Sequence, residues 1–445
     1  MYSEDITKAM ASGGIAVGDT VSVKGGNISV EGELMPKTEA GNDGTLIIKL
    51  KSGYNIGIVF GEGVSISRVS ARSAPAAFPF TKPKANTRLP NVTVLWTGGT
   101  IGSKIDYRTG GVYMTVKPEE LLYYVPELSG IANISINHLF GTSSEDLTHL
   151  EWQKIAEETA KAINGGARGV VITHGTDTMH YTASALGFML KNLNAPVVLT
   201  GSQRSSDRGS SDAFLNLTCA MHLAAKSDVA EVGICMHASS SDDRLSFIRG
   251  VKARKMHTSR RDAFRPINDR PLAMVRHNGD ISYTNQYRRV AQGRSPEVEV
   301  SGKFEPKVAL IKAYPGSEPG VIDYYTGKGY RGIIIEGTGL GHTPVSIEHE
   351  GRSWLPYIKR AVDGGAVVGM TSQCLYGRVH RNVYKNLRLL SNAGVVYCED
   401  MLPETAYVKL GWLLGNYSGD RAAELLCRNV AGEINERVSI DEFLD

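Results

Sequence analysis

Hydroxyl residues and glycines stand together at two places in the chain, each directly after a short apolar run. Residues 97–100 read Thr-Gly-Gly-Thr and follow the apolar residues 92–96, while residues 174–178 read His-Gly-Thr-Asp-Thr and follow residues 169–173. Apolar runs of this length are typical of buried strands in a parallel sheet. Because ligands of open α/β sheets bind beyond the carboxyl ends of the strands, both turns could surround one small molecule. Hydroxyls, an aspartate and free backbone N–H groups in one crevice predict acyl-transfer chemistry.

The first turn offers a nucleophile. Hydrolysis of an unactivated amide needs a nucleophile, a base that deprotonates it and donors for the oxyanion. Thr100 supplies a hydroxyl, and Gly98 and Gly99 let the backbone approach a substrate closely because glycine has no Cβ. The same four residues could equally form a glycine turn with capping threonines at the start of a helix. Neither of the common phosphate-binding glycine motifs follows residues 92–96.

The second turn adds Thr176 and Asp177. A threonine hydroxyl is a weak nucleophile until a neighbouring base takes its proton. A lysine beside Thr176 and Asp177 could serve as that base, and Lys255 is the candidate, although lysines are more often solvated. His174 and His180 could ligate a metal, but no third ligand at suitable spacing accompanies them. We therefore take both histidines as structural and expect no metal.

Ser144 and Glu145 are candidates for binding the α-amino and α-carboxylate groups of an amino acid. They follow an apolar run at residues 131–140. The sequence after Ser144 also reads as a loop that leads into the N-cap of a helix at residues 150–163. The residues alone do not separate these two interpretations.

The rest of the chain predicts three folded parts that position these residues. Residues 1–70 hold short β-branched segments between glycine, asparagine and aspartate turns, which is typical of a small β-barrel module. Prolines at 71–90 indicate a semi-rigid linker. Apolar runs that alternate with amphipathic segments predict parallel α/β domains at 91–285 and, with a tail, at 308–445. An irregular, charged stretch at 286–307 separates the two.

The expected elements can be stated as residue ranges. In the module, strands are expected at 19–24, 27–34, 45–50 and 55–60. In the first α/β domain, strands are expected at 92–96, 169–173, 196–200 and 231–236, with helices at 150–163 and 181–193. In the second, strands are expected at 308–313, 332–335, 366–369 and 394–397, before a tail at 421–445 that begins as a helix.

Composition excludes several classes of protein. The 445 residues are enough for two to three domains, and a net charge of +3 is too small to imply nucleic-acid binding. We expect the basic stretch 249–261 to be a solvated face. No apolar run approaches the ~20 residues that cross a bilayer, and the N-terminus lacks a secretion signal pattern, so we expect a cytoplasmic protein. We expect the five widely spaced cysteines to be buried and reduced.

The two turns together resemble the paired signature of bacterial-type L-asparaginases. The resemblance rests on residues 94–101 and 171–179, which stand in the right order, and it covers about residues 91–420. It implies an asparaginase-like two-domain core that needs no metal or organic cofactor. It also implies the following site. Thr100 is the primary nucleophile, Thr176, Asp177 and Lys255 form the second catalytic group, and Gly99, Ser144, Glu145 and Gly175 bind the substrate.

Segments outside that signature resemble the GatD family of archaeal glutamyl-tRNA(Gln) amidotransferases. The N-terminal module and residues 201–207 and 255–262 carry this second resemblance. It implies a glutaminase that passes ammonia to a GatE-like partner, which binds Glu-tRNA(Gln) and uses ATP and Mg²⁺. It further implies a homodimer of this chain within a heterotetramer. One position departs from the asparaginases: Val112 stands where they carry a loop tyrosine, flanked by Tyr107 and Tyr113.

Two other functions remain open at this point. One is a free-standing L-asparaginase, for which the N-terminal module would have no evident use. The other is a non-catalytic tRNA-docking scaffold, in which the basic stretch 249–261 binds phosphate.

Overall fold

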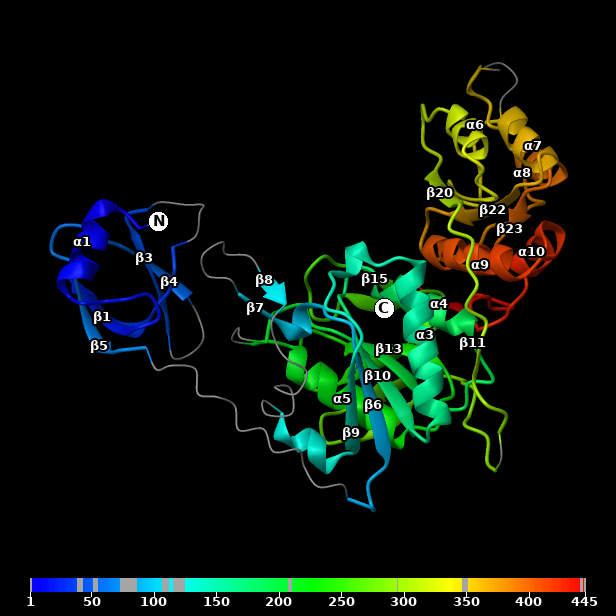
Figure 1. Cartoon of the computed structure of the whole chain (residues 1–445). Coiled ribbons are helices and arrows are strands. Elements are labelled where there is room, and N and C mark those ends of the chain that lie inside the picture. The colour runs from blue at the N-terminus through cyan, green and yellow to red at the C-terminus, as the bar shows by residue number, and fades with distance from the viewer. Residues whose placement is uncertain are drawn as a thin grey trace.

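Figure 1 shows a β-rich N-terminal module, a central domain built on a large sheet and a C-terminal domain built on a smaller one. This computed structural model describes residues 2–37, 43–50, 55–72, 86–105, 112–114, 125–206, 210–293, 295–345, 351–440 and 443. No helix in these described ranges is long and apolar enough to span a bilayer.

The N-terminal module is a five-stranded antiparallel sheet with the order β4-β3-β2-β1-β5. Along β1, Val21 and Val23 are buried and alternate with more exposed residues, as in a strand with one face on a core. The predicted small β module is confirmed. Strand β5 and helix α1 were not predicted. Helix α1 has a single fully buried residue, Ile6. The bounds are α1 (Glu4–Ser12), β1 (Thr20–Gly25), β2 (Ile28–Leu34), β3 (Thr45–Lys49), β4 (Asn55–Val59) and β5 (Ser65–Ser70).

The central sheet has eight strands in the order β18-β17-β14-β13-β12-β10-β6-β9. Its parallel part holds β6 (Asn91–Trp96), β9 (Asn133–His138), β10 (Gly169–Thr173), β12 (Val197–Thr200) and β13 (Val232–His237). The antiparallel part holds β14 (Leu245–Arg249), β17 (Ala273–Val275) and β18 (Ile281–Tyr283).

Helices cover both faces of the central sheet. Helices α3 (His149–Asn164) and α4 (Met179–Met189) share one apolar core with Val170 and Ile172 of β10, whereas α5 (Ala213–Lys226) shares the other with Val171. Neighbouring residues of β10 point to opposite faces of the sheet, and helices cover both faces, so every residue of the strand is buried. This is why its sequence is a continuous apolar run.

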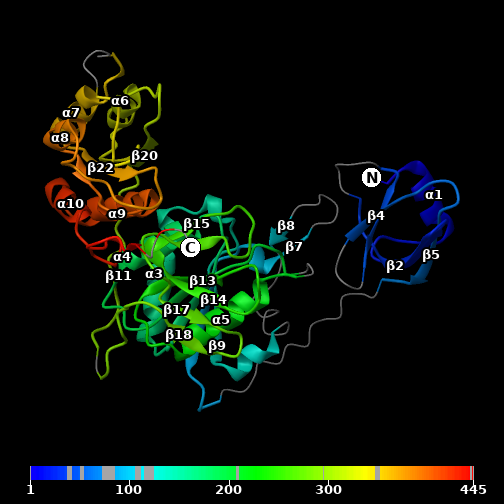
Figure 2. The same cartoon turned by 180° about the vertical axis from the view of Figure 1, so that it is seen from behind.

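The C-terminal domain is a four-stranded parallel sheet of β20 (Val308–Lys312), β21 (Gly332–Gly337), β22 (Val367–Ser372) and β23 (Val396–Tyr397). Helices α6 (Gly320–Gly327), α7 (Leu355–Asp363) and α8 (Lys385–Asn392) accompany it, as do α9 (Pro403–Asn416) and α10 (Gly419–Leu426). Figures 1 and 2 show α9 and α10 between this sheet and the central domain. Phe188 of α4 stacks on Trp412 of α9, so the two α/β domains share one apolar core.

Short elements complete the described chain. They are the 3₁₀-helices η1 (Thr100–Gly102), η2 (Pro126–Gly130), η3 (Ser144–Asp146) and η4 (Gly250–Lys252), and strands β7 (Ser103–Ile105), β8 (Val112–Met114), β11 (Leu190–Lys191), β15 (Ala253–Lys255), β16 (Phe264–Pro266) and β19 (Glu299–Val300).

The predicted strands of both α/β domains are present, with ends shifted by a few residues, whereas the expected end of one helix and the expected burial of all five cysteines are wrong. Helix α4 ends at Met189, short of residue 193, because β11 follows it and pairs with β19, inside the stretch expected to be irregular. The tail begins as a helix, as expected, and this helix, α10, ends at Leu426. Cys374 and Cys427 are exposed, although the other three cysteines are buried as expected. The domain boundaries stay predictions.

The strand register brings the functional turns to one edge of the central sheet. Trp96 at the end of β6 lies opposite Thr173 of β10, and Thr173 lies opposite Thr200 of β12. The Thr97 hydroxyl donates a hydrogen bond to the Thr173 carbonyl oxygen at 2.6 Å. The first residue of the turn after β6 is therefore joined to the last residue of β10.

The turn after β10 rests on the buried side chain of His174. Its Nδ1 lies 2.7 Å from the Gly175 carbonyl oxygen, which can only accept, so Nδ1 carries the proton. Nε2 lies 2.8 Å from the Thr182 hydroxyl and accepts from it. With both nitrogens occupied, His174 is structural and has no lone pair for a metal. Burial lowers the pKa of His174 to about 4.

The pKa of His174 predicts a specific loss of stability in acid. Because the folded-state pKa lies below the usual value of 6.5, the unfolded chain binds more protons between these pH values, and stability falls as the pH falls. Going from pH 7 to pH 5 should cost about 2 kcal/mol through this residue alone. The measurement is the free energy of unfolding in urea at pH 7 and at pH 5. We expect the difference between these two values to be smaller by that amount in His174→Asn than in the wild type. The exposed His380 is the control, and His380→Asn should leave the difference unchanged. An undiminished difference in His174→Asn would contradict a neutral buried histidine.

Candidate active site

The first turn can approach the second only because Gly99 has no side chain. Gly98 and Gly99 have φ values of 108° and 87°, a region that favours glycine. A Cβ on Gly99 would lie 2.5 Å from the Gly175 nitrogen and 2.6 Å from the His174 carbonyl carbon. The two turns are therefore in backbone contact. Thr100 follows directly, partly exposed, and begins η1.

The second turn packs in the same way against Ser144. A Cβ on Gly175 would lie 2.7 Å from both Cβ and Oγ of Ser144. The Thr178 hydroxyl donates to the Ser144 carbonyl oxygen at 2.6 Å. Ser144 is buried in η3, and Glu145 beside it is exposed. The contact between Thr178 and Ser144 was not predicted, although Thr178 lies within the second motif.

The loop after Ser144 leads into the N-cap of helix α3, as one of the two interpretations of this segment expects. Helix α3 begins at His149, and its N-cap is Thr148, whose hydroxyl accepts from the Leu150 N–H at 3.2 Å. The Glu151 carboxylate accepts from the Thr148 N–H at 2.7 Å and completes a capping box. Ser144 lies before this cap and against the second turn, and its binding of a substrate stays a prediction.

Lys255 is the residue that joins the second turn to a distant strand. It ends β15, which pairs with β16 in antiparallel fashion. Its Nζ lies 2.9 Å from the Thr176 hydroxyl and 2.6 Å from Asp177 Oδ1. The Lys255 side chain is 9% exposed, so the alternative of a solvated lysine is wrong. A lysine in this position can exchange a proton with the Thr176 hydroxyl while the Asp177 carboxylate balances its charge.

These contacts bring most of the predicted site residues together. Gly99 touches Gly175, Gly175 touches Ser144, and Lys255 binds Thr176 and Asp177. Thr100 and Thr176 are each the next residue after one of the touching glycines. Two threonines, a lysine and an aspartate therefore lie together at this edge of the sheet.

The loop beyond Thr100 is described in part. Tyr107 lies outside the described residues. Val112 and Tyr113 lie on β8, which pairs with β7 so that Tyr113 is opposite Lys104. Within the described ranges, no group of three or more His, Cys, Asp or Glu side chains is arranged to hold a metal ion.

Only residues 256–260 of the basic stretch 249–261 form the solvated face that the sequence predicted, because residues 249–255 are buried or half-buried. Each of its basic residues has a carboxylate partner within the chain. The pairs are Arg249 with Glu231 and Asp269, Lys252 with Asp400, Arg254 with Glu404, Lys255 with Asp177, Arg260 with Asp262, and Arg261 with Asp242. The sequence holds no local sign of these pairs, because Asp400 and Glu404 are about 150 residues away.

Models of known protein families match all three parts of the chain. Residues 91–289 match "Asparaginase, N-terminal", and residues 307–425 match "Glutaminase/Asparaginase C-terminal domain". Residues 15–69 match "GatD N-terminal domain". Among solved structures, the thermostable L-asparaginase from Thermococcus kodakarensis has a TM-score of 0.68 and 30% identity, covering 78% of this chain and all of its own. L-asparaginase I from Vibrio cholerae has the same TM-score and 31% identity, covering 78% and 99%.

Relatives that match along nearly the whole chain share one description, the D subunit of glutamyl-tRNA(Gln) amidotransferase. The relative from Pyrococcus furiosus is 51% identical over 438 residues, covering 97% of this chain and 98% of its own. The relative from Methanothermobacter thermautotrophicus is 45% identical and covers 99% of each chain. The resemblances drawn from the two turns and from the N-terminal module are confirmed. The chain belongs to the GatD family of glutamyl-tRNA(Gln) amidotransferases, which has an asparaginase-like two-domain core behind a small β module.

Proposed function

We propose that this chain is the glutaminase component of a tRNA-dependent amidotransferase and hydrolyses L-glutamine through a threonine acyl-enzyme. One observation carries the proposal. Lys255 Nζ lies within hydrogen-bond distance of Thr176 and Asp177 in the second turn. Gly99, the residue before Thr100, is in backbone contact with the same turn. A nucleophile, a relay for its proton and backbone donors are the parts that amide hydrolysis needs.

The reaction follows from these positions in two steps. The Thr100 oxygen attacks the side-chain carbonyl carbon of glutamine, while backbone N–H groups of the two turns stabilise the oxyanion. The Thr100 proton passes through Thr176 and Lys255 to the leaving nitrogen, and ammonia departs as the C–N bond breaks. Water then attacks the resulting ester, which releases glutamate and restores the Thr100 hydroxyl.

The neighbouring residues provide a place for the amino-acid end of the substrate. Ser144 is buried against Gly175, and the Glu145 carboxylate is exposed beside it. A carboxylate can pair with the α-ammonium group, and a hydroxyl can donate to the α-carboxylate. Gly99 and Gly175 let the substrate lie close to the backbone of both turns.

The relatives are named as one subunit of an amidotransferase, which supports a reaction shared between this chain and a partner chain. We infer a GatE-like partner that holds ATP and Mg²⁺, activates Glu-tRNA(Gln) and uses the ammonia to make Gln-tRNA(Gln). In this proposal the present chain needs no cofactor, works in the cytoplasm, and forms a homodimer within a heterotetramer.

Two alternatives are less well supported. The solved L-asparaginases favour a free-standing L-asparaginase as the second candidate. The match of residues 15–69 to the GatD module argues for the amidotransferase instead. A tRNA-docking scaffold is the weaker interpretation, because carboxylates of the chain already occupy the stretch 249–261.

Removing the nucleophile or the lysine should stop ammonia release. In the complex with the partner chain, Thr100→Ala and Lys255→Met should each lower glutamine-dependent ammonia release at least about a thousandfold. When residues act as one catalytic unit, the loss of any one of them removes most of the rate enhancement. Circular dichroism should show an unchanged fold. Thr326→Ala in α6 and Lys359→Met in α7 are matched controls and should keep full activity. Near-normal ammonia release by either site variant would refute the assignment.

Substrate preference separates the two candidate functions. We expect the complex to hydrolyse glutamine faster than asparagine, and to do so faster still when Glu-tRNA(Gln) is present. Steady-state ammonia release with each amino acid, with and without the charged tRNA, measures both effects. Rapid asparagine hydrolysis that ignores the tRNA would instead support the free-standing L-asparaginase.

A further inference from the structure

The segment that carries Lys255 runs between the central and C-terminal domains. It leaves β14 at Arg249, passes through η4 and ends as β15 at Lys255. Strand β15 has three residues and pairs only with the equally short β16 among the described strands. So short a ladder constrains a strand weakly. The position of Lys255 therefore depends on what holds the side chains before it.

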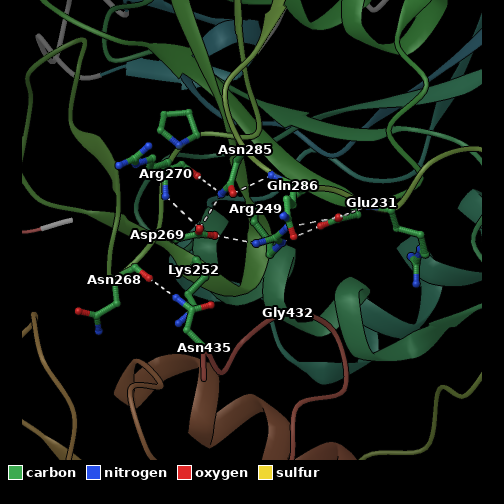
Figure 3. Close-up of polar contacts among 12 residues, drawn as sticks. Glu231, Arg249, Lys252, Asn268, Asp269, Arg270, Asn285, Gln286, Gly432 and Asn435 are labelled. Atoms are coloured by element: carbon green, nitrogen blue, oxygen red, sulfur yellow. Dashed lines mark hydrogen bonds and ion pairs between the residues drawn. The ribbon is translucent and has the colours of Figure 1, made fainter. Parts of the chain in front are cut away.

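The start of this segment is anchored inside the central domain. Arg249 Nε donates to Glu231 at 2.7 Å, and Nη1 donates to Asp269 at 2.8 Å. Asp269 also accepts from the side chain of Asn285 at 2.6 Å. Figure 3 shows Arg249 between these carboxylates, with Gly432 of the C-terminal domain close by. Pairing with two carboxylates in a partly desolvated place fixes the planar guanidinium in one orientation.

The middle of the segment is bound by the C-terminal domain. Lys252 Nζ donates to Asp400 Oδ2 at 2.6 Å, and the two side chains are 1% and 0% exposed. The other oxygen of Asp400 accepts from the Asn435 N–H at 3.0 Å. The Thr405 hydroxyl at the start of α9 donates to the Val251 carbonyl oxygen at 3.1 Å. A shift of the segment 249–255 would separate Lys252 from Asp400 and leave a buried charge without its partner. The pair therefore disfavours other positions of this segment.

The residue next to Lys255 is bound to the same helix. Arg254 forms an ion pair with Glu404, which lies in the first turn of α9 and is buried. The helix N-terminus favours a carboxylate there. Burial raises the pKa of the Glu404 carboxyl, and the nearby Arg254 opposes that shift. Side chains alternate along a strand, so an Arg254 held toward α9 directs Lys255 to the opposite side, where Thr176 and Asp177 lie.

We propose that the C-terminal domain positions the catalytic lysine: Asp400 and Glu404 hold Lys252 and Arg254, and this orients Lys255 toward Thr176. Arg254 and Glu404 are positioning residues that act through Lys255 without touching the substrate. This inference rests on the proposed role of Lys255 in the glutaminase reaction.

The test is Glu404→Gln in the full complex, which removes the charge and keeps the shape. We expect kcat for glutamine to fall about tenfold or more, with KM changed less than about twofold, because a displaced catalytic group slows the chemistry without weakening binding. Arg254→Gln should have the same effect. The double variant should lose no more than either single one, because the two residues act as a pair.

A matched control separates positioning from loss of stability. Glu433 is another buried carboxylate of the same domain, and it pairs at 2.6 Å with Lys409, which is not part of the segment 249–255. Glu433→Gln should lower the urea-unfolding midpoint and keep kcat within about twofold at a temperature where circular dichroism shows the protein folded. A wild-type kcat in Glu404→Gln, or an equal loss in Glu433→Gln, would overturn the inference. In either case an inactive Lys255→Met would leave the proposed function standing, whereas an active Lys255→Met would refute that function itself.

Discussion

Gly99 lies so close to the peptide between His174 and Gly175 that no side chain fits between them. This backbone contact is the constraint on which the site depends. It joins the ends of β6 and β10, which the Thr97 hydroxyl also links through the Thr173 carbonyl oxygen. Each of the two threonines expected to do chemistry is the next residue after the contact. An alanine at position 99 would force the two turns apart and would thereby separate Thr100 from the proton relay that we propose for it.

The second requirement is a lysine brought from outside these turns. Lys255 reaches Thr176 and Asp177 from a strand whose neighbouring side chains belong to the domain junction. The stacking of Phe188 on Trp412 and the shared apolar core supply the attraction between the domains. The buried pairs of Lys252 and Arg254 contribute less net stability than this core, and they select one arrangement of the segment. In the proposed reaction the two domains therefore act as one catalytic unit.

Much of this arrangement can be predicted from the sequence, and the rest cannot for physical reasons. Strand β10 is buried on both faces, so its continuous apolar run marks it out, and the turn after it follows from parallel-sheet topology. The sequence makes Lys255 a candidate base, but it does not predict the contact of Lys255 with Asp177, because this contact spans 78 residues and no local pattern encodes it. The features that were wrongly predicted also depend on contacts with residues far away in the chain. The basic stretch 249–261 looks solvated until Asp400 and Glu404 are placed beside it, and the early end of α4 depends on the pairing of β11 with β19.

The central claim is that Thr100 is the residue that becomes acylated. The most direct measurement treats the complex with 6-diazo-5-oxo-L-norleucine, a glutamine analogue that alkylates nucleophiles in glutamine sites, and locates the adduct by peptide mass spectrometry. The account predicts one adduct per chain, on Thr100, that glutamine prevents and Thr100→Ala abolishes. An adduct on Thr176 or Lys255, with Thr100 unmodified, would contradict it.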